Sequence, residues 1–196
     1  MSDCYNSYMP LKELVKDRLW EYENFLTDDE VDTLLNIARA TDEPGWRVDN
    51  LNPHDGHYAG KSLHVAGIEG VTPKIEAINR RIEALFTGTK RMVPTGTIVR
   101  NSEILHPVGL HRDNEDENMV DNRNAECRFG ILIYLNSDFD GGEICYPEYG
   151  IEYKPKRGVL IIHHAGNLHG VNPVSNGIRY SMTSFAWGND SELVGM

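Results

Sequence analysis

Three residues of this 196-residue chain have the types and spacing of a metal site. His111 and Asp113 form an H-x-D tripeptide in a strand-like context. Side chains two residues apart on a β-strand point to the same face, so this imidazole and carboxylate can converge on one point. A third ligand is predicted at His169, 58 residues downstream (169 − 111), arriving from a different strand. Two histidines and one carboxylate on one face of an octahedron leave three positions open, an arrangement that suits Fe(II).

Arg179 adds a second kind of binding group. It lies ten residues after His169 (179 − 169) and is followed by Ser181. An open Fe(II) site needs a source of electrons, and a 2-oxo diacid held by its far carboxylate supplies them. Because the planar guanidinium fork binds a carboxylate through two parallel hydrogen bonds, Arg179 is the candidate for that carboxylate.

The pattern His111-x-Asp113, His169 and Arg179-x-Ser181 resembles that of the 2-oxoglutarate/Fe(II)-dependent dioxygenases, and within them the prolyl 4-hydroxylase-like branch. Residues 133–136, 140–143, 146–147 and 155–158 also match that branch in order and approximate spacing. The resemblance covers residues 91–187 and extends weakly to residues 22–30.

The resemblance implies the following site residues: His111, Asp113 and His169 as Fe(II) ligands and catalytic residues, and Arg179, Ser181 and Tyr134 as contacts of 2-oxoglutarate. It implies a hydroxylase that consumes 2-oxoglutarate and O2, with ascorbate as a further cofactor, and that releases succinate and CO2. A prolyl residue in a peptide or protein is the family's usual substrate, and other amino-acid side chains or free amino acids stay open. Relatives often carry a Tyr nine or ten residues before the first histidine, where this sequence has Ser102 and Asn101, so that contact is unassigned.

Three rival interpretations remain. A nucleic-acid demethylase of the same family would carry a second Arg six residues after the first, where this chain has Phe185. A zinc hydrolase accepts the same ligands but gives no reason for Arg179 and Ser181. A catalytically inactive jelly roll used as a binding module is the third. The remaining histidines compete as ligands or are solvated: His106, His163 and His164 in the first group, and His54, His57 and His64 in the second.

Composition restricts the partners. The formal net charge of −11 disfavours nucleic acid, which needs clustered Lys and Arg. Three cysteines without a C-x-x-C pair indicate a reducing compartment. No run of 18 apolar residues and no signal-peptide pattern occurs, so we expect a soluble, cytoplasmic protein that does not bind membranes. The oligomeric state stays open.

We expect one domain over residues 1–196, of α+β, mostly β class: helical support and a lid in 1–90, and a double-stranded β-helix (jelly-roll) catalytic core in 91–187. Apolar periodicity and a capping-box pattern, with Thr27 or Asp28 as the cap and Glu30 at its third position, predict a helix ending near Arg39. A second helix is predicted from Thr72 to about Phe86, its polar face solvated. From residue 92 onward, short apolar runs between Gly- and Pro-rich turns predict strands at 93–100, 107–113, 127–135, 143–146, 158–163, 168–173 and 179–187. The polar, turn-forming residues 50–60, between strands near 46–48 and 62–65, are predicted to close over the substrate.

The turn before Arg179 decides which face that residue occupies. A two-residue turn at Asn176-Gly177 would put Arg179 on the face opposite His169. A three-residue loop beginning at Ser175, with Gly177 in the left-handed conformation, would put both on one face of a hairpin, and the function requires this second loop.

Overall fold

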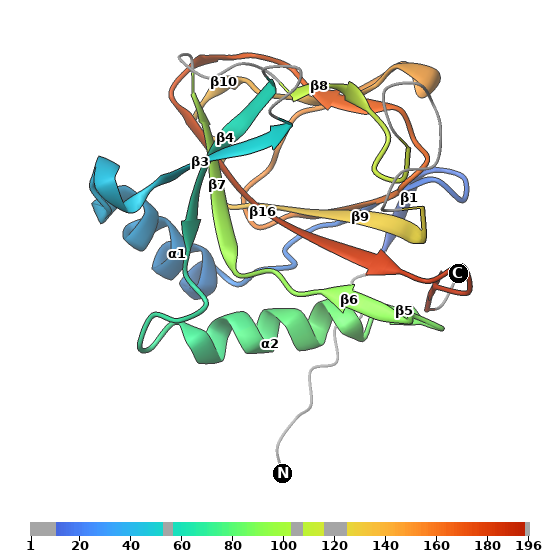
Figure 1. The fold of residues 1–196 in the computed structure, drawn as a ribbon, viewed down its shortest axis with the longest axis horizontal. Helices are drawn as coiled ribbons and strands as arrows, with labels where there is room; N and C mark the ends of the chain where they lie inside the picture. The colour runs from blue at the N-terminus through green and yellow to red at the C-terminus, as the bar shows by residue number, and fades with distance from the viewer. Residues whose placement is uncertain (1–10, 53–56, 103–107, 116–124, 195–196) are drawn as a thin grey trace.

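The structure is built around two antiparallel β-sheets that face each other (Figure 1). It is a computed structural model and describes residues 11–52, 57–102, 108–115 and 125–194. The larger sheet contains, in spatial order, β1 (Lys12–Val15), β2 (Leu19–Tyr22), β13 (Leu160–His164), β9 (Cys127–Tyr134), β16 (Ile178–Trp187), β7 (Thr97–Ser102), β4 (His57–His64) and β3 (Arg47–Asn52), with β6 (Arg91–Val93) beside β16. The smaller sheet contains β12 (Ile151–Tyr153), β11 (Ile144–Tyr146), β14 (His169–Val171) and β8 (Val108–His111). Two short pairs, β10 (Asp140–Gly141) with β15 (Val174–Asn176) and β17 (Glu192–Leu193) with β5 (Phe86–Thr87), complete the strands. The fold is the predicted double-stranded β-helix, or jelly roll.

Aromatic and apolar side chains fill the space between the two sheets: Leu19, Tyr134, Ile144, Tyr146, Tyr153, Val159 and Ile161. Alternation along each strand decides which residues reach this interior. On β9, Ile133 faces the helices and Tyr134 faces the interior. On β16, Tyr180 faces the helices, so Arg179 and Ser181 point the other way, into the interior. The sheet thereby delivers polar groups to one enclosed space.

Two helices, α1 (Asp28–Ala40) and α2 (Thr72–Glu83), cover the outer face of the larger sheet (Figure 1). The predicted capping box is present at Thr27 and Glu30, each side chain bonding the other's backbone N–H. The predicted apolar stripes are the buried residues: Val31, Leu34, Leu35 and Ala38 on α1, and Ile75, Ile78 and Ile82 on α2. Helix α2 ends three residues earlier than predicted, because Phe86 pairs with Leu193 in the β5–β17 ladder.

The polar face of α2 was expected to be solvated, but one of its residues forms an ion pair with α1. Arg81 donates to both carboxylate oxygens of Glu30 on α1, at 2.9 and 2.8 Å. Its guanidinium also lies over the Phe25 ring, 5.2 Å from the centroid. Burial raises the pKa of Glu30, but the Arg81 bond and the bonds within the cap outweigh it and lower that pKa overall. A charged pair therefore ties the two helices together.

Two sequence predictions about connections are wrong in detail. Strands β3 and β4 extend to Asn52 and from His57, so most of the expected loop 50–60 is strand; residues 53–56 lie outside the described residues. The hairpin predicted around Gly177 does not form either. Gly177 has the required positive φ, +80°, but β15 pairs with β10, whereas β16 crosses into the larger sheet between β7 and β9.

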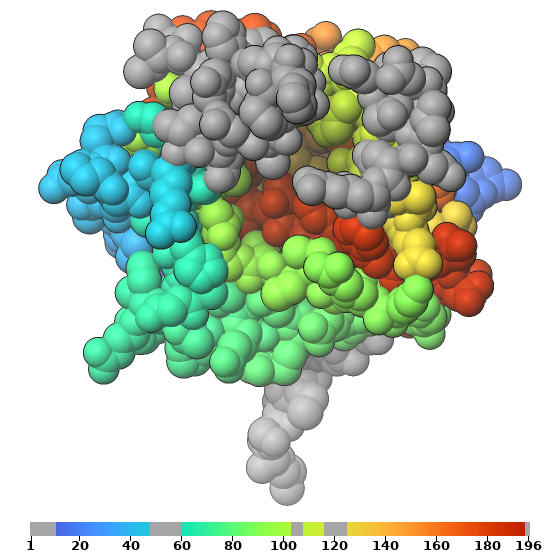
Figure 2. Space-filling model, viewed as in Figure 1, coloured from blue at the N-terminus to red at the C-terminus, as the bar shows by residue number. Residues whose placement is uncertain are grey.

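Figure 2 shows α2, β6 and β7 as one continuous green face with β16 in red beside it.

Within the described part of the chain, none of the helices has the length and apolarity needed to cross a bilayer.

Candidate metal and cosubstrate site

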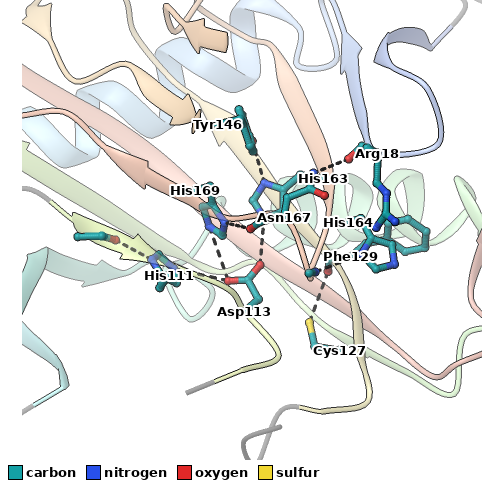
Figure 3. Close-up of polar contacts among 12 residues, drawn as sticks. Arg18, His111, Asp113, Cys127, Phe129, Tyr146, His163, His164, Asn167 and His169 are labelled. Carbon is teal, nitrogen blue, oxygen red and sulfur yellow. Dashed lines mark hydrogen bonds and ion pairs between the residues drawn. The ribbon is translucent and has the colours of Figure 1, made fainter. Parts of the chain in front are cut away.

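Three side chains converge where β8 meets β14. His111 ends β8 and lies directly opposite His169 in the β8–β14 ladder, with ring centroids 4.4 Å apart. Asp113 lies in a turn just beyond β8, where its backbone N–H donates to the Ala165 carbonyl at 2.9 Å. Its Oδ1 lies 3.7 Å from His111 Nε2 and 3.8 Å from His169 Nε2 (Figure 3). The convergence is as predicted, but a turn rather than a shared strand brings the carboxylate to the two histidines.

Hydrogen bonds to backbone carbonyls orient both imidazoles. Nδ1 of His111 bonds to the Gly109 carbonyl, and Nδ1 of His169 bonds to the Asn167 carbonyl, each at 2.9 Å. Because a carbonyl only accepts, each Nδ1 carries the proton and each Nε2 presents a lone pair. Two imidazole lone pairs and a carboxylate oxygen thus lie within 4.8 Å of one another without a donor among them. This set fits a divalent metal ion such as Fe(II).

Protonation at neutral pH also suits metal binding. Burial lowers the pKa of His169 to about 3, so its ring is neutral. For Asp113, burial favours the protonated acid, but the hydrogen bond from His163 and the nearby imidazoles outweigh it and lower the pKa to about 2. A neutral imidazole and an ionised carboxylate are the forms that bind metals.

His163, which the sequence left as a competing ligand, instead contacts the carboxylate. Its Nε2 lies 2.9 Å from Asp113 Oδ2, and its Nδ1 lies 2.9 Å from the Tyr146 hydroxyl. Both His163 and Tyr146 are buried. A histidine inside the apolar run of β13 was the available signal, because a buried polar side chain needs a partner.

Two of the other histidines, His164 and His64, are described and lie apart from this cluster. His164 points away from Asp113, accepts from the Gly166 N–H at 3.1 Å and packs edge-on against Phe129 (Figure 3). Burial lowers its pKa to about 4. His64 is exposed on β4, 3.3 Å from the Thr97 hydroxyl. The structure does not describe the side chains of His54, His57 and His106.

Arg179 enters the same interior from the larger sheet. It pairs with Asn101 of β7, while Ser181 pairs with Tyr134 of β9. Its Nη1 donates to Asn101 Oδ1 at 2.9 Å and to Ser181 Oγ at 3.2 Å. The guanidinium carbon lies 5.0 Å from the centroid of the Tyr134 ring. Arg179 and His169 therefore face one interior from opposite sheets, and not from one hairpin.

The edge of the Arg179 guanidinium formed by Nε and Nη2 indicates what this corner could bind. Nε and Nη2 of Arg179 are buried and have no hydrogen-bond partner among the described residues, and the same holds for the Tyr134 hydroxyl. Buried donors without partners are rare in folded proteins. Two parallel N–H groups beside a phenol match the two oxygens of a carboxylate, so this corner fits one end of a diacid.

Asn101 is a contact that the sequence left unassigned. It is buried at one of the two positions where relatives often carry a Tyr, and it holds Nη1 of Arg179. Together with Ser181 it orients the guanidinium so that its Nε–Nη2 edge stays available. Asn101, where this sequence differs from relatives that carry a Tyr, therefore lies within the candidate cosubstrate site.

Comparison with known proteins agrees with this geometry. Residues 103–187 match the sequence model of the 2OG-Fe(II) oxygenase superfamily. A PKHD-type hydroxylase of Synechococcus sp. (strain JA-2-3B'a(2-13)) is 35% identical over 82 residues, which cover 39% of this chain and 36% of the relative. The aligned region thus spans about a third of the length of that curated relative.

Two solved structures share the fold. The viral collagen prolyl hydroxylase of Paramecium Bursaria Chlorella virus-1, in complex with 2OG, superposes with a TM-score of 0.63 at 16% identity, over 87% of this chain and 96% of that one. A prolyl hydroxylase from Trichoplax adhaerens, in complex with a hypoxia inducible factor peptide fragment, gives a TM-score of 0.65 at 15% identity, over 88% and 84%. Residues 103–187 thus match the 2OG-Fe(II) oxygenase superfamily in sequence, and the chain shares its fold with two prolyl hydroxylases.

Proposed function

We propose that this protein is a 2-oxoglutarate- and O2-dependent hydroxylase. In this proposal His111, Asp113 and His169 bind Fe(II), and Arg179, Ser181 and Tyr134 bind the distal carboxylate of 2-oxoglutarate. The substrate is a prolyl or other amino-acid side chain in a peptide or protein, and succinate and CO2 are released.

The observation that carries the proposal is the buried, partnerless edge of Arg179 beside the Tyr134 hydroxyl. A metal triad alone suits several reactions. A bound carboxylate would satisfy a guanidinium edge that opens into the same interior as the triad, because an isolated buried donor loses its hydration without replacement. A diacid that reaches the triad with its other end satisfies both corners.

The chain's residues would then have separate tasks. His111 and His169 present the Nε2 atoms that face Asp113, and Asp113 presents a negative oxygen that the pKa of about 2 keeps ionised. Arg179 orients the cosubstrate from the opposite sheet through its free edge. The walls of the jelly roll, including Tyr146 and Ile144, exclude water from the reacting groups. When bound, Fe(II) with 2-oxoglutarate and O2 supplies the oxidation that converts a substrate C–H bond to C–OH.

The zinc-hydrolase and inactive-module interpretations fit less well. Zinc would accept the same three ligands, but a hydrolytic site gives no task to Arg179. An inactive module would not need two imidazoles held with Nε2 lone pairs toward one carboxylate oxygen. Both interpretations lack a reason for the guanidinium edge.

The substrate class is proposed by analogy with the relatives, whose names describe prolyl hydroxylases, one of them bound to a peptide. Ascorbate is proposed as an additional cofactor, to be tested by its omission from the assay. A single domain over residues 1–196 and a cytoplasmic location stay predictions.

The test is succinate formation by purified protein supplied with Fe(II), 2-oxoglutarate and O2. We expect slow turnover without substrate, and none in His111→Ala or Asp113→Ala. Arg100→Ala is the matched control, because Arg100 lies on the neighbouring strand β7 but packs on Trp46, a residue of the helix-side core. A screen of proline-containing and other peptides for a gain of one oxygen, by mass spectrometry, would identify the substrate. Equal succinate formation by the wild type and both triad variants would refute the proposal.

A further inference from the structure

The two oxygens of Asp113 have different neighbours. Oδ1 faces the Nε2 atoms of His111 and His169, at 3.7 and 3.8 Å. Oδ2 is 2.9 Å from Nε2 of His163, which comes from the larger sheet. The carboxylate is therefore divided between a metal-facing oxygen and an oxygen held by the protein (Figure 3).

The direction of each hydrogen bond in this group follows from what the atoms can do. An ionised carboxylate only accepts, so Nε2 of His163 must carry the proton. In the tautomer with the proton on Nε2, Nδ1 of this ring accepts from the Tyr146 hydroxyl, 2.9 Å away. The result is a directed chain from Tyr146 through His163 to Asp113 in which both bonds are satisfied.

Burial makes this chain a fixed part of the fold. His163 is 1% exposed and Tyr146 is 0% exposed, so neither can turn to water for a substitute partner. Gly130 on β9 leaves the room they need, because a Cβ there would collide with Nε2 of His163 and lie 2.5 Å from Asp113 Oδ2. The glycine in β9 therefore leaves space for the contact between His163 and Asp113.

We propose that His163 and Tyr146 are positioning residues that reserve Oδ2 of Asp113, so that the carboxylate binds the metal through Oδ1 alone. The proposal rests on the proposed function. Three single-atom ligands leave three of six octahedral positions open. 2-Oxoglutarate needs two of them and O2 needs the third. A carboxylate that bound through both oxygens would close the third position.

The decisive experiment measures that third position directly. Protein is loaded anaerobically with saturating Fe(II) and 2-oxoglutarate, and nitric oxide, a surrogate for O2, is titrated while the electron paramagnetic resonance signal of its iron complex is recorded. We expect His163→Phe, which fills the space but donates no hydrogen bond, to weaken nitric oxide binding by about tenfold or more. Tyr146→Phe keeps the ring and should weaken it less, in the same direction. His163→Gln restores an N–H donor and should recover part of the loss.

Two controls separate a positioning role from a general loss of packing. Tyr153→Phe removes a buried tyrosine hydroxyl that donates to Glu21 at 2.6 Å, away from the triad. His164→Gln changes the next residue of the same strand, which points away from Asp113. Both should bind nitric oxide like the wild type.

The outcomes are distinguishable. Unchanged nitric oxide binding in metal-saturated His163→Phe and Tyr146→Phe would overturn the positioning role, whatever happens to stability. If His163→Phe does not fold, Tyr146→Phe and His163→Gln decide the question alone. An Asp113→Ala variant serves as the check on the site itself. If it bound Fe(II) as the wild type does, the proposed function would fail; if it lost Fe(II), only the positioning of Oδ2 would be in question.

Discussion

His111 and His169 lie directly opposite each other in the β8–β14 ladder, with their ring centroids 4.4 Å apart. Strand β8 is the edge of the smaller sheet, and β14 is its neighbour there. A metal ion held by His111, Asp113 and His169 would therefore join the end of an edge strand, the following turn and an inner strand.

The first prediction is that metal binding stabilises the fold. An ion at 100 times its Kd adds about 2.7 kcal/mol by mass action. For a chain of this size each kcal/mol shifts Tm by about 2–4 °C, so Mn(II) or Co(II) should raise Tm by about 5–11 °C. Calorimetric scans with and without metal would measure this. The shift should vanish in His111→Ala and persist in His64→Ala, which changes an exposed histidine.

The second prediction concerns Arg179. Arg179→Ala should raise the KM for 2-oxoglutarate by about 30- to 4000-fold, because losing one partner of a buried, charged pair costs about 2–5 kcal/mol. Arg179→Lys should recover only part, since Lys keeps the charge without the fork. Iron affinity, measured separately, should change little. An unchanged KM for 2-oxoglutarate in Arg179→Ala would show that Arg179 does not bind the cosubstrate.

The third prediction concerns Asn101, which holds Nη1 of Arg179. Asn101→Ala should raise the same KM by about tenfold, because one hydrogen bond to a charged group contributes about 1.5 kcal/mol. Asn101→Asp should preserve the acceptor and the orientation of Arg179, but its negative charge would oppose a bound carboxylate. Steady-state kinetics at varied 2-oxoglutarate would rank the two variants. Equal KM values in the wild type and Asn101→Ala would count against a positioning role.

Local patterns predicted what depends on local physics. The capping box at Thr27 and the apolar stripe of α1 follow from helical periodicity, which acts over a few residues. The H-x-D spacing predicted that the His111 and Asp113 side chains converge, although Asp113 lies in a turn and not on the strand.

Pairing between distant strands was the part that local patterns could not predict. The positive φ of Gly177 was inferred correctly, yet turn chemistry does not decide which sheet the next strand joins. The contact between His163 and Asp113 likewise depends on β13 lying beside the turn after β8, through the Asp113 N–H and Ala165 carbonyl bond. Such contacts follow from the register of the whole sheet.

The fourth prediction is a pH dependence of stability at the helix pair. Because the pKa of Glu30 is lowered in the folded protein, its ionised form stabilises the fold above the unfolded pKa, near 4.5. This contribution is lost as pH falls through the lower, folded pKa. Arg81→Met should cost about 1–3 kcal/mol at neutral pH, and the difference from the wild type should shrink below about pH 4. Urea unfolding at several pH values would measure it. A difference that stayed constant down to pH 2 would exclude the ion pair as its cause.

The last prediction uses Gly130 to test how tightly the carboxylate is held. A methyl group at this position would meet His163 Nε2 and Asp113 Oδ2 at once, and both atoms are fixed by their mutual hydrogen bond. Gly130→Ala should therefore separate the pair, at a cost of about 1–3 kcal/mol for overpacking, and should weaken Fe(II) binding along with stability. Gly67→Ala is the matched control, because a Cβ there meets nothing within 4 Å. Metal titration and thermal unfolding of both variants would compare them. If Gly130→Ala bound iron as the wild type does, Asp113 could reach the metal without its contact to His163, and the close fit of β9 against the pair would serve packing alone.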